Sequence, residues 1–385
     1  MKRLLILGST GSIGRNTLAV VRRFSRRFSV EGLTTYSNIG VLQGQIKEFK
    51  PRYVYVEDTL KALVLKERLS LKKTKLILGE GALKKMIQDE NIDTVIFALP
   101  GSRGFIPLIW AIESKKEIIL ASKEPLVMAG RFIMQKAYKS KVKILPVDSE
   151  QSAIWQCIEG KDKSKIKCVY LTASGGPLRK VPLGDFKNVS LKKLLRHPCW
   201  KMGKKITVDS ASLMNKGFEV IETKFLFDIP LEKIKVLIHP QAIVHSMVEF
   251  CDGTIFAHLA IPDMRLPIQY ALFYPERPEN SFGIVDFYRL KNLSFYKPDF
   301  KKFKCLSLAY EVAKKGGTSL AVLNSSDEVC VQEVLKGKMK FFLIPEVIKK
   351  VLDLHKNKTN PSIEDILWSD IWARQKTYEV ISKLN

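Results

Sequence analysis

The chain contains 385 residues, of which 46% are hydrophobic and 27% are charged. At roughly 150 residues per domain, this length predicts two or three domains, and the composition excludes collagen-like, low-complexity and disordered chains. The 64 Lys and Arg residues outnumber the 39 Asp and Glu residues and give a formal net charge of +25. Such an excess suggests nucleic acid, a membrane surface or a phosphorylated small molecule as the partner.

The basic residues are dispersed, and even the densest groups (22–27, 161–167 and 301–304) are interrupted by apolar or small residues. The sequence has no aromatic-interleaved RNA motif and no zinc-finger spacing. We therefore interpret the charge as solvated surface and expect no nucleic-acid partner. No apolar run approaches the roughly 18 residues of a membrane span, and the run at residues 4–7 is too short for a signal peptide. We expect a cytoplasmic protein with reduced cysteines and no membrane partner.

The first 148 residues alternate short apolar runs with helix-length segments, which is typical of a parallel sheet covered on both faces. The expected strands are residues 3–7, 29–34, 53–56, 75–78, 94–98, 117–120 and 143–147. The expected helices are residues 15–24, 59–69, 81–89 and 106–114. This pattern predicts an α/β protein with a Rossmann-like N-terminal domain at residues 1–148.

From residue 149 the pattern becomes mixed. The expected elements are strands at 169–173 and 234–238, a loop at 172–177 and a helix at 210–227. Asp252-Gly253 separates two strand-like runs, 246–251 and 254–259, and predicts a two-residue hairpin. We assign residues 149–285 to a central α+β domain with a flexible lid near residues 174–204.

The last part of the chain is predicted to be helical. Pro275, Pro278 and Pro298 punctuate an irregular stretch, in which we place a linker at residues 286–305. The helices expected after it are residues 306–315, 320–335, 345–355 and 363–384. They predict a small C-terminal helical bundle at residues 306–385.

A glycine-rich motif, Gly8-Ser9-Thr10-Gly11-Ser12-Ile13-Gly14, follows the first expected strand and opens the first helix. Glycine permits a tight turn and a close approach of the backbone to a pyrophosphate, and the free N–H groups of the helix start bind the anion. The spacing is G-x-x-G-x-x-G, so an ordinary glycine turn is the alternative. In its strand–turn–helix context we favour dinucleotide binding.

Two carboxylates, Asp148 and Glu150, follow the last expected strand of the sheet. Residues i and i+2 on extended backbone point the same way, so both can converge on one cation. Oxygen ligands favour Mg²⁺ or Mn²⁺. A solvated loop end is the alternative interpretation.

Two later motifs offer groups that could hold an anion. Ser174-Gly175-Gly176 supplies a hydroxyl and backbone amides, although an ordinary glycine turn fits as well. Ser210, Asn215 and Lys216 supply a hydroxyl, an amide and a cation, which is the inventory for holding a phosphate. Glu219 lies three residues after Lys216 and shares its helix face, where a surface ion pair is the alternative.

The segment from His197 to Gly203 contains Trp200 and Met202 in a polar stretch and suits a mobile lid. A core tryptophan is the alternative.

Together and in this order, these motifs resemble the 1-deoxy-D-xylulose 5-phosphate reductoisomerase family. Ser122-Lys123-Glu124, His239-Pro240-Gln241 and Pro262-Asp263-Met264-Arg265 also match, and the resemblance covers the whole chain. It implies an NADPH-dependent oxidoreductase and isomerase of non-mevalonate isoprenoid biosynthesis. Such an enzyme acts on a phosphorylated sugar and pairs as a homodimer near the predicted hairpin.

The resemblance also implies a role for each candidate residue. The implied ligands of the divalent metal are Asp148, Glu150 and Glu219, with Mg²⁺ or Mn²⁺ expected and Co²⁺ as a third candidate. The implied phosphate-binding residues are Ser174, Ser210, Asn215 and Lys216. The implied contacts to the rest of the substrate are Lys123, Ser149, Glu150 and His197, and Lys123 and His197 count with the metal ligands as catalytic. Trp200 and Met202 lie on the implied lid over the substrate. The implied NADPH contacts are Gly8, Thr10, Gly11, Ser12, Ile13, Asn38, Glu124 and Gly203.

The chain departs from the family pattern in three places. Ser122 stands where the family usually has Asn, and residues 99–104 differ from the usual Val-Gly-Ala-Ala-Gly form. Ser37, in Tyr36-Ser37-Asn38, stands where the family usually has Lys. The loop at 34–38 contains no acid that would favour NADH, so we expect NADPH, with weaker discrimination unless another basic residue folds nearby.

The implied reaction converts 1-deoxy-D-xylulose 5-phosphate to 2-C-methyl-D-erythritol 4-phosphate. A carbon-skeleton rearrangement precedes hydride transfer from NADPH, and the metal acts as a Lewis acid. Both a retro-aldol route and an α-ketol shift fit the sequence. The main alternative is an NADP-dependent polyol-phosphate dehydrogenase without rearrangement, and a nucleic-acid binder is suggested only by the charge.

Overall fold

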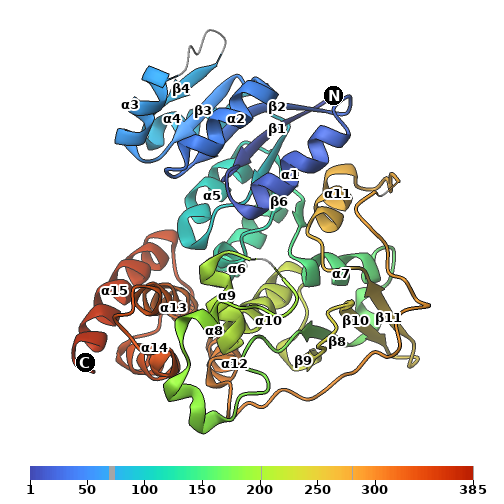
Figure 1. The fold of residues 1–385 in the computed structure, drawn as a ribbon, viewed down its shortest axis with the longest axis vertical. Helices are drawn as coiled ribbons and strands as arrows, with labels where there is room; N and C mark the ends of the chain where they lie inside the picture. Colours follow the sequence, from blue (N-terminus) through green and yellow to red (C-terminus); the bar gives the residue numbers. More distant parts are fainter. Residues whose placement is uncertain (69–73, 201, 280, 385) are drawn as a thin grey trace. The chain divides into compact units, whose positions relative to one another are not determined.

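The computed structural model describes residues 1–68, 74–200, 202–279 and 281–384, and Figure 1 shows its helices and strands. The chain divides into two compact units. The first unit comprises Met1–Pro125, Ile133–Asp148 and Asp263–Phe282. The second unit comprises Leu126–Phe132, Ser149–Pro262 and Gly283–Asn385.

A parallel sheet forms the centre of the first unit. Its strands are β1 (Lys2–Leu7), β2 (Phe28–Thr35), β3 (Tyr53–Val56), β4 (Lys75–Ile77), β5 (Thr94–Phe97), β6 (Glu117–Leu120) and β7 (Ile144–Pro146). Within the described residues they lie in the order β4-β3-β2-β1-β5-β6-β7, and every neighbouring pair is parallel. The order reverses between β1 and β5, and open α/β sheets bind ligands beyond the carboxyl ends of the strands at such a point.

Helices of the first unit cover this sheet. They are α1 (Ser12–Arg23), α2 (Ile39–Phe49), α3 (Thr59–Arg68), α4 (Glu80–Gln88), η1 (Gly101–Gly104), α5 (Phe105–Glu113) and α11 (Arg265–Phe273), with part of α6 (Glu124–Lys139). All four residues of β5 are buried, and successive strand residues point to opposite faces. Both faces of the sheet are therefore covered, as predicted.

Several helices are absent from the sequence interpretation, among them α2, α6 and α11 and, in the second unit, α7 (Ser149–Ile158). Glycine interrupts the apolar pattern of α2 at two places and that of α6 at Gly130, where the backbone is also kinked at Ala129. A side chain at Gly130 would collide with Phe225, so packing and not helix propensity determines this glycine. Residue 69, included in the predicted helix 59–69, lies outside the described residues.

A smaller mixed sheet belongs to the second unit. Its strands are β8 (Ile166–Ala173), β9 (Ile234–Ile238), β10 (Val244–Phe250) and β11 (Ile255–Leu259), in the order β11-β10-β8-β9. β8 and β9 are parallel, and the pairs of β10 with β8 and β11 are antiparallel. The predicted hairpin between β10 and β11 is confirmed, but its turn is longer than the predicted two residues. The Gly253 N–H donates to the Phe250 carbonyl at 3.0 Å, and Gly253 follows this turn with a left-handed φ of +85°, as in three-residue hairpin loops.

The predicted helix at 210–227 is wrong as a single element. The structure has two helices there, α9 (Lys204–Ser212) and α10 (Met214–Leu226), separated by Leu213 with a left-handed φ of +59°. The Ser212 hydroxyl accepts a hydrogen bond from the Met214 N–H at 3.2 Å and replaces a lost helical bond. No Gly or Pro marks the break, so the periodicity continued through it.

Further helices belong to the second unit, in addition to α7. They are α12 (Lys304–Lys315), α13 (Ser319–Leu335), α14 (Ile344–Leu354) and α15 (Ile363–Ser382), with the short elements η2 (Lys163–Lys165), η3 (Leu183–Asn188), α8 (Leu191–Leu194), η4 (Leu231–Lys233) and η5 (Phe341–Leu343). Nearly the whole of α13 is buried, which makes it the centre of the predicted C-terminal bundle. None of the helices in the described part of the chain combines the length and apolar character needed to span a membrane.

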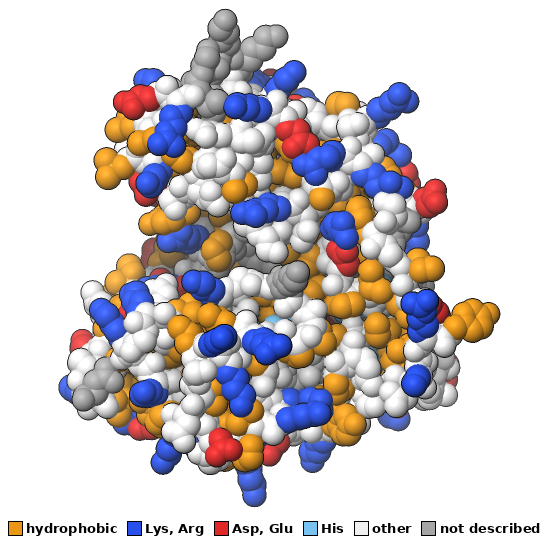
Figure 2. Space-filling view, viewed as in Figure 1, with side chains coloured by type: hydrophobic (Ala, Val, Ile, Leu, Met, Phe, Trp, Pro, Cys, Tyr) orange, Lys and Arg blue, Asp and Glu red, His pale blue; other side chains and the backbone are white. Residues whose placement is uncertain are grey.

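Basic side chains are scattered over the face seen in Figure 2 and do not form one continuous patch. This distribution agrees with the dispersal of Lys and Arg along the sequence.

A buried acidic pair joins α9 to α13. Asp209 and Asp327 are 1% and 0% exposed. Lys205 Nζ lies 2.8 Å from Asp209 Oδ2 and 3.5 Å from Asp327 Oδ2. Burial, followed by the nearby Asp209 charge, raises the pKa of Asp327 well above its ordinary value, although Lys205 opposes this.

We expect Asp327→Asn to flatten the decline in stability with rising pH. The folded-state pKa of Asp327 lies above the unfolded value of about 3.9. The folded state therefore binds more protons between these two pKa values, and the free energy of unfolding falls as the pH rises through that window. Asn imitates the protonated acid and removes a cost of about 1.4 kcal/mol per pH unit of that window. Urea unfolding at a series of pH values from about 4 upward measures it.

The exposed residue Asp185 provides the control variant, Asp185→Asn, which should leave the pH profile unchanged. An Asp327→Asn profile as steep as that of the wild type would contradict a raised pKa of Asp327.

Candidate active site

A glycine turn at residues 8–14 connects β1 to α1 beyond the carboxyl end of the sheet. Gly8 has a φ of +84°, and a Cβ there would lie 2.4 Å from the carbonyl oxygen of Ala98. A Cβ on Gly14 would lie 2.4 Å from the Gly8 carbonyl oxygen. The turn therefore requires glycine at both positions. Gly11 is the N-cap of α1, and the first turn of that helix contains no acid, so its free N–H groups can bind an anion.

Hydrogen bonds fix the glycine turn to β2 and α2. The Gly8 N–H donates to Thr34 Oγ1 at 2.8 Å, and the hydroxyls of Thr10 and Thr35 are 2.6 Å apart. Ser9 Oγ donates to Gln45 Oε1 at 2.7 Å, and Gln45 Nε2 donates to the Ser9 carbonyl at 2.8 Å. The side chains of Ser9 and Thr10 are thus held in the protein interior. No motif in the sequence indicated Gln45, because its role depends on a contact across 36 positions.

The other predicted cofactor contacts lie at three helix starts. Asn38 caps α2, and its Oδ1 accepts from the Val41 N–H at 3.3 Å. Glu124 is the first residue of α6. Gly203 is the N-cap of α9 in the second unit.

Lys123 and Asp148 form a buried ion pair in the first unit. Lys123 follows β6 and Asp148 follows β7, and these strands are parallel neighbours. Their carboxyl ends meet at one edge of the sheet, which brings the two side chains together. The exposed fractions are 5% for Lys123 and 9% for Asp148.

A second charged group in the second unit is centred on Lys216. Its Nζ donates to Glu150 Oε1 at 2.8 Å and also to Glu219 Oε2. Asn215 Nδ2 donates to Glu219 Oε1 at 2.5 Å. Glu219 is 1% exposed and Lys216 is 3% exposed. Burial opposes the charge of Lys216, but the two glutamates outweigh burial and raise its pKa.

Three carboxylates come together here. One oxygen each of Asp148, Glu150 and Glu219 can be chosen so that all lie within 4.8 Å of one another; we call this set the carboxylate cluster. Asp148 immediately precedes α7, so the chain itself carries it beside Glu150 in the first turn of that helix. Three neighbouring negative charges repel one another unless cations compensate them, and Lys123 and Lys216 supply two positive charges. The oxygen-only donor set fits Mg²⁺ or Mn²⁺.

His197 joins two predicted phosphate-binding residues. Its Nε2 lies 3.1 Å from Ser174 Oγ and 3.1 Å from Ser210 Oγ. Its Nδ1 accepts backbone N–H bonds from Cys199 at 3.2 Å and Trp200 at 2.9 Å. Because Nδ1 is an acceptor, the proton of the neutral ring lies on Nε2. Burial lowers the pKa of His197 to about 4, so the ring is neutral at pH 7.

Two glycines allow this group to form. Gly175 and Gly176 have φ values of +85° and +66°, and a Cβ on Gly176 would lie 2.5 Å from the Ser210 carbonyl oxygen. The loop after β8 can therefore approach α9 closely. The break at Leu213 then divides the predicted phosphate set: Ser174 and Ser210 lie with His197, and Asn215 and Lys216 contact the acids of the carboxylate cluster.

Trp200 is half-buried, and its ring centroid lies 6.0 Å from that of His245 on β10. Burial lowers the pKa of His245 to about 4. No motif in the sequence indicated this residue. Met202 is also half-buried. At the start of α7, Ser149 Oγ donates to Glu150 Oε2 at 2.5 Å. Lys201, between the two predicted lid residues, lies outside the described residues.

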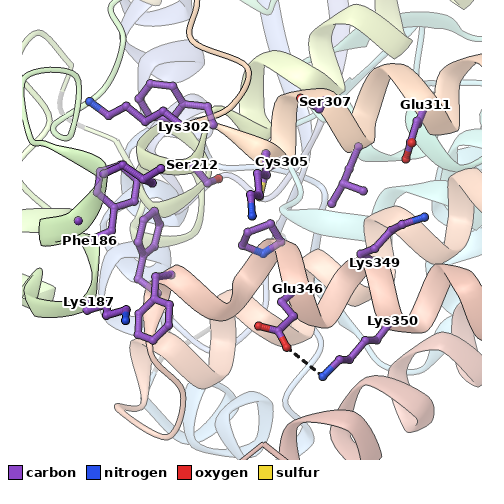
Figure 3. A pocket seen from close by; sticks show the side chains of 18 residues that line it. Phe186, Lys187, Ser212, Lys302, Cys305, Ser307, Glu311, Glu346, Lys349 and Lys350 are labelled. Atoms are coloured by element: carbon purple, nitrogen blue, oxygen red, sulfur yellow. Dashed lines mark ion pairs between the residues drawn. The ribbon is translucent and has the colours of Figure 1, made fainter.

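A cavity of about 850 Å³ is lined in part by residues 183–187, which lie within the predicted lid. Figure 3 shows Phe186 and Lys187 on one side of it and Glu346 and Lys350, an ion pair at 2.9 Å, on another. The Phe186 ring centroid lies 6.2 Å from that of Phe303 and 6.1 Å from that of Phe341. These contacts attach η3 to the C-terminal helices. The cavity lining includes none of the predicted site residues.

Comparison with known proteins agrees with this geometry. Residues 4–130 match the 1-deoxy-D-xylulose 5-phosphate reductoisomerase family, residues 144–227 match its C-terminal domain, and residues 259–376 match the DXP reductoisomerase C-terminal domain. The chain is 51% identical over 377 residues to the 1-deoxy-D-xylulose 5-phosphate reductoisomerase of Caldanaerobacter subterraneus subsp. tengcongensis, covering 98% of each chain. It is 48% identical to that of Thermoanaerobacter pseudethanolicus, again covering 98% of each.

Solved structures show the same likeness. A crystal structure described as DOX-P reductoisomerase in complex with NADPH, fosmidomycin and magnesium is 36% identical, with a TM-score of 0.94 over 100% of this chain and 99% of that one. The enzyme from Zymomonas mobilis in complex with NADPH is 36% identical, with a TM-score of 0.91 over 99% of each chain. The carboxylate cluster, the glycine turn and these likenesses agree, and the chain belongs to the 1-deoxy-D-xylulose 5-phosphate reductoisomerase family.

Proposed function

We propose that this chain carries out the NADPH- and divalent-metal-dependent rearrangement and reduction of 1-deoxy-D-xylulose 5-phosphate to 2-C-methyl-D-erythritol 4-phosphate. The observation that carries the proposal is the carboxylate cluster, with oxygens of Asp148, Glu150 and Glu219 within 4.8 Å of one another. We infer the reaction from the family to which the chain belongs. The reaction belongs to non-mevalonate isoprenoid biosynthesis.

Asp148, Glu150 and Glu219 would hold the metal. A bound divalent cation supplies Lewis-acid polarisation of the substrate carbonyl and compensates developing negative charge. Lys216 already contacts Glu150 and Glu219, and Lys123 contacts Asp148. These lysines orient the acids, and they can donate to substrate oxygens. The Ser149 hydroxyl, which donates to Glu150, can accept a hydrogen bond from a hydroxyl of the sugar.

Ser174, Ser210 and the neutral ring of His197 would bind the substrate phosphate. Nε2–H of His197 and the two hydroxyls are donors held around one point by the glycine loop. Asn215 and Lys216 complete the proposed substrate set from the start of α10. Trp200 and Met202, on the proposed lid at residues 174–204, would cover the substrate and exclude water.

NADPH would bind by its pyrophosphate at the glycine turn. The backbone of Gly8, Thr10, Gly11, Ser12 and Ile13 supplies the anion site, and the further proposed contacts are Asn38, Glu124 and Gly203. The bound nicotinamide supplies hydride to the rearranged aldehyde. We keep the division at 1–148, 149–285, 286–305 and 306–385 as a proposal, together with a cytoplasmic location.

The experiment that tests this function follows NADPH oxidation with 1-deoxy-D-xylulose 5-phosphate in the presence of Mg²⁺ and identifies the product by NMR. The branched carbon skeleton of 2-C-methyl-D-erythritol 4-phosphate is expected. A linear polyol phosphate would show instead the alternative function, a dehydrogenase without rearrangement.

Glu219→Gln should reduce turnover by about 100-fold or more, because a metal site contributes several kcal/mol to the transition state. The fold should survive, since Gln keeps the size of Glu219 and can still accept from Lys216. Turnover with Mn²⁺ and the urea unfolding midpoint measure the two effects. Glu232→Gln, at an exposed acid of the same unit, is the control. Full activity of the wild type after chelation would contradict the metal assignment.

Trp200→Ala should raise KM or lower kcat by about 10-fold. The free energy of unfolding should change little, because substitutions outside the packed core usually change it by no more than about 0.5 kcal/mol. The contrast is Trp155→Ala. Trp155 is 9% exposed, and truncating a core Trp typically costs about 3–5 kcal/mol. Kinetics and urea unfolding of both variants decide the matter. If the free energy of unfolding fell as much in Trp200→Ala as in Trp155→Ala, Trp200 would be a core residue.

The proposed homodimer should form through the outer strand β11. Ile255 and Phe256 on this strand are 52% and 42% exposed, and β11 lies at the end of the strand order. An unpaired strand edge with apolar side chains favours association. Light scattering at micromolar concentration should give twice the chain mass. Ile255→Lys should lower that mass, and Leu60→Lys, at a 76% exposed residue of α3, should leave it unchanged. A monomeric wild type would contradict the proposal.

A further inference from the structure

The loop after β2 lacks the cation that an NADPH 2′-phosphate usually meets. Its residues Tyr36, Ser37 and Asn38 carry no charge, and binding sites for NADP commonly place an Arg here. Two acids lie directly beside the loop, because the Glu57 N–H donates to the Thr35 carbonyl at 3.1 Å and the Asp58 N–H donates to the Tyr36 carbonyl at 2.9 Å. Their charges disfavour a phosphate unless a nearby cation offsets them.

Arg103 brings a cation to this loop from another strand. It lies in η1, which follows β5, and β5 and β2 flank β1 on opposite sides. Its guanidinium carbon lies 4.2 Å from the centroid of the Tyr36 ring. Arg103 thus reaches from the β5 side across the end of β1 to the β2 loop, in the same unit as the glycine turn.

The contact with Tyr36 leaves the guanidinium available to a ligand. A cation over an aromatic face is held by the ring and not by hydrogen bonds, so the N–H groups that face away from the ring can donate to phosphate oxygens. Both Arg103 and Tyr36 are exposed. A planar guanidinium binds phosphate through paired hydrogen bonds and can also stack on a flat ring.

We propose that Arg103 binds the 2′-phosphate of NADPH and so determines the preference for NADPH over NADH. The proposal rests on the proposed function, because it assumes that the glycine turn binds this cofactor. In this chain Arg103, from the loop after β5, replaces the lysine expected at position 37. Tyr36 acts as a positioning residue that holds the guanidinium over the β2 loop.

Arg15 is the other cation to consider. Its Nε donates to the Thr10 carbonyl at 2.9 Å, which places it at the glycine turn and therefore beside the pyrophosphate that both cofactors carry. Replacement of Arg15 should weaken the binding of NADPH and of NADH alike, whereas replacement of Arg103 should weaken the binding of NADPH alone.

Binding without turnover tests the proposal first. Calorimetric titration with adenosine 2′,5′-bisphosphate and with 5′-AMP compares ligands that differ only in the 2′-phosphate. Loss of a charge-assisted hydrogen bond predicts an affinity for the bisphosphate about 10-fold lower in Arg103→Gln, with 5′-AMP binding unchanged. Lys47→Gln is the control: Lys47 is exposed on α2, and nine residues at 1.5 Å each separate it from Asn38 by about 13 Å. Equal loss for both ligands, or no loss, would overturn the proposal.

Kinetics separates failure of the proposal from failure of the function. The ratio of kcat/KM for NADPH to that for NADH should fall about 10-fold in Arg103→Gln, and Ser37→Lys in that background should restore it. Tyr36→Phe should keep the ratio, and Tyr36→Leu should lower it. An unchanged ratio in an active Arg103→Gln enzyme would refute the role of Arg103. A wild type that fails to oxidise NADPH with the substrate would instead refute the proposed function.

Discussion

The carboxylate cluster imposes the strictest constraint on this molecule, because three acids can share a largely buried space only with positive charge among them. Two lysines meet that need in different ways. Lys123 pairs with Asp148 along one edge of the parallel sheet, and Lys216 lies between Glu150 and Glu219. Glu219 and Lys216 are almost completely buried, so loss of Lys216 would leave Glu219 without its cation, whereas loss of the Glu219 charge leaves Lys216 paired with Glu150. The same acids and their cations form the proposed reaction centre.

The backbone around the cluster accommodates this requirement. The ends of the adjacent strands β6 and β7 bring Lys123 to Asp148, and the start of α7 then places Glu150 two residues later. The left-handed Leu213 divides α9 from α10, so Ser210 lies with His197 while Lys216 and Glu219 lie with Glu150. A single straight helix through residues 210–227 would not place Ser210 beside His197 and also place Lys216 and Glu219 beside Glu150.

Much of this was predictable from the sequence because several patterns are local. The strands of the first sheet are continuous apolar runs, and the glycine turn and the Asp252-Gly253 hairpin have residues that their backbone conformations require. The break at Leu213 was not predictable, because no Gly or Pro marks it. The Ser212 hydroxyl, which accepts a hydrogen bond from the Met214 N–H, accompanies the break instead. The pairing of Arg103 with Tyr36 was not predictable either, because it joins loops 67 positions apart. Likewise, the side chains of Asn215 and Lys216 are of types that bind phosphate, but only the fold shows that they contact acids of the carboxylate cluster.

The most direct measurement of the central claim is a titration of the protein with Mn²⁺ followed by electron paramagnetic resonance. One bound ion per chain is predicted for the wild type. Glu150→Gln should weaken that site by at least about 10-fold, as expected when a charged ligand of a divalent cation becomes neutral. Glu159→Gln, at an exposed acid immediately after α7, should bind like the wild type. If the wild type bound no Mn²⁺, or if both variants bound it equally well, the carboxylate cluster would not be the metal site.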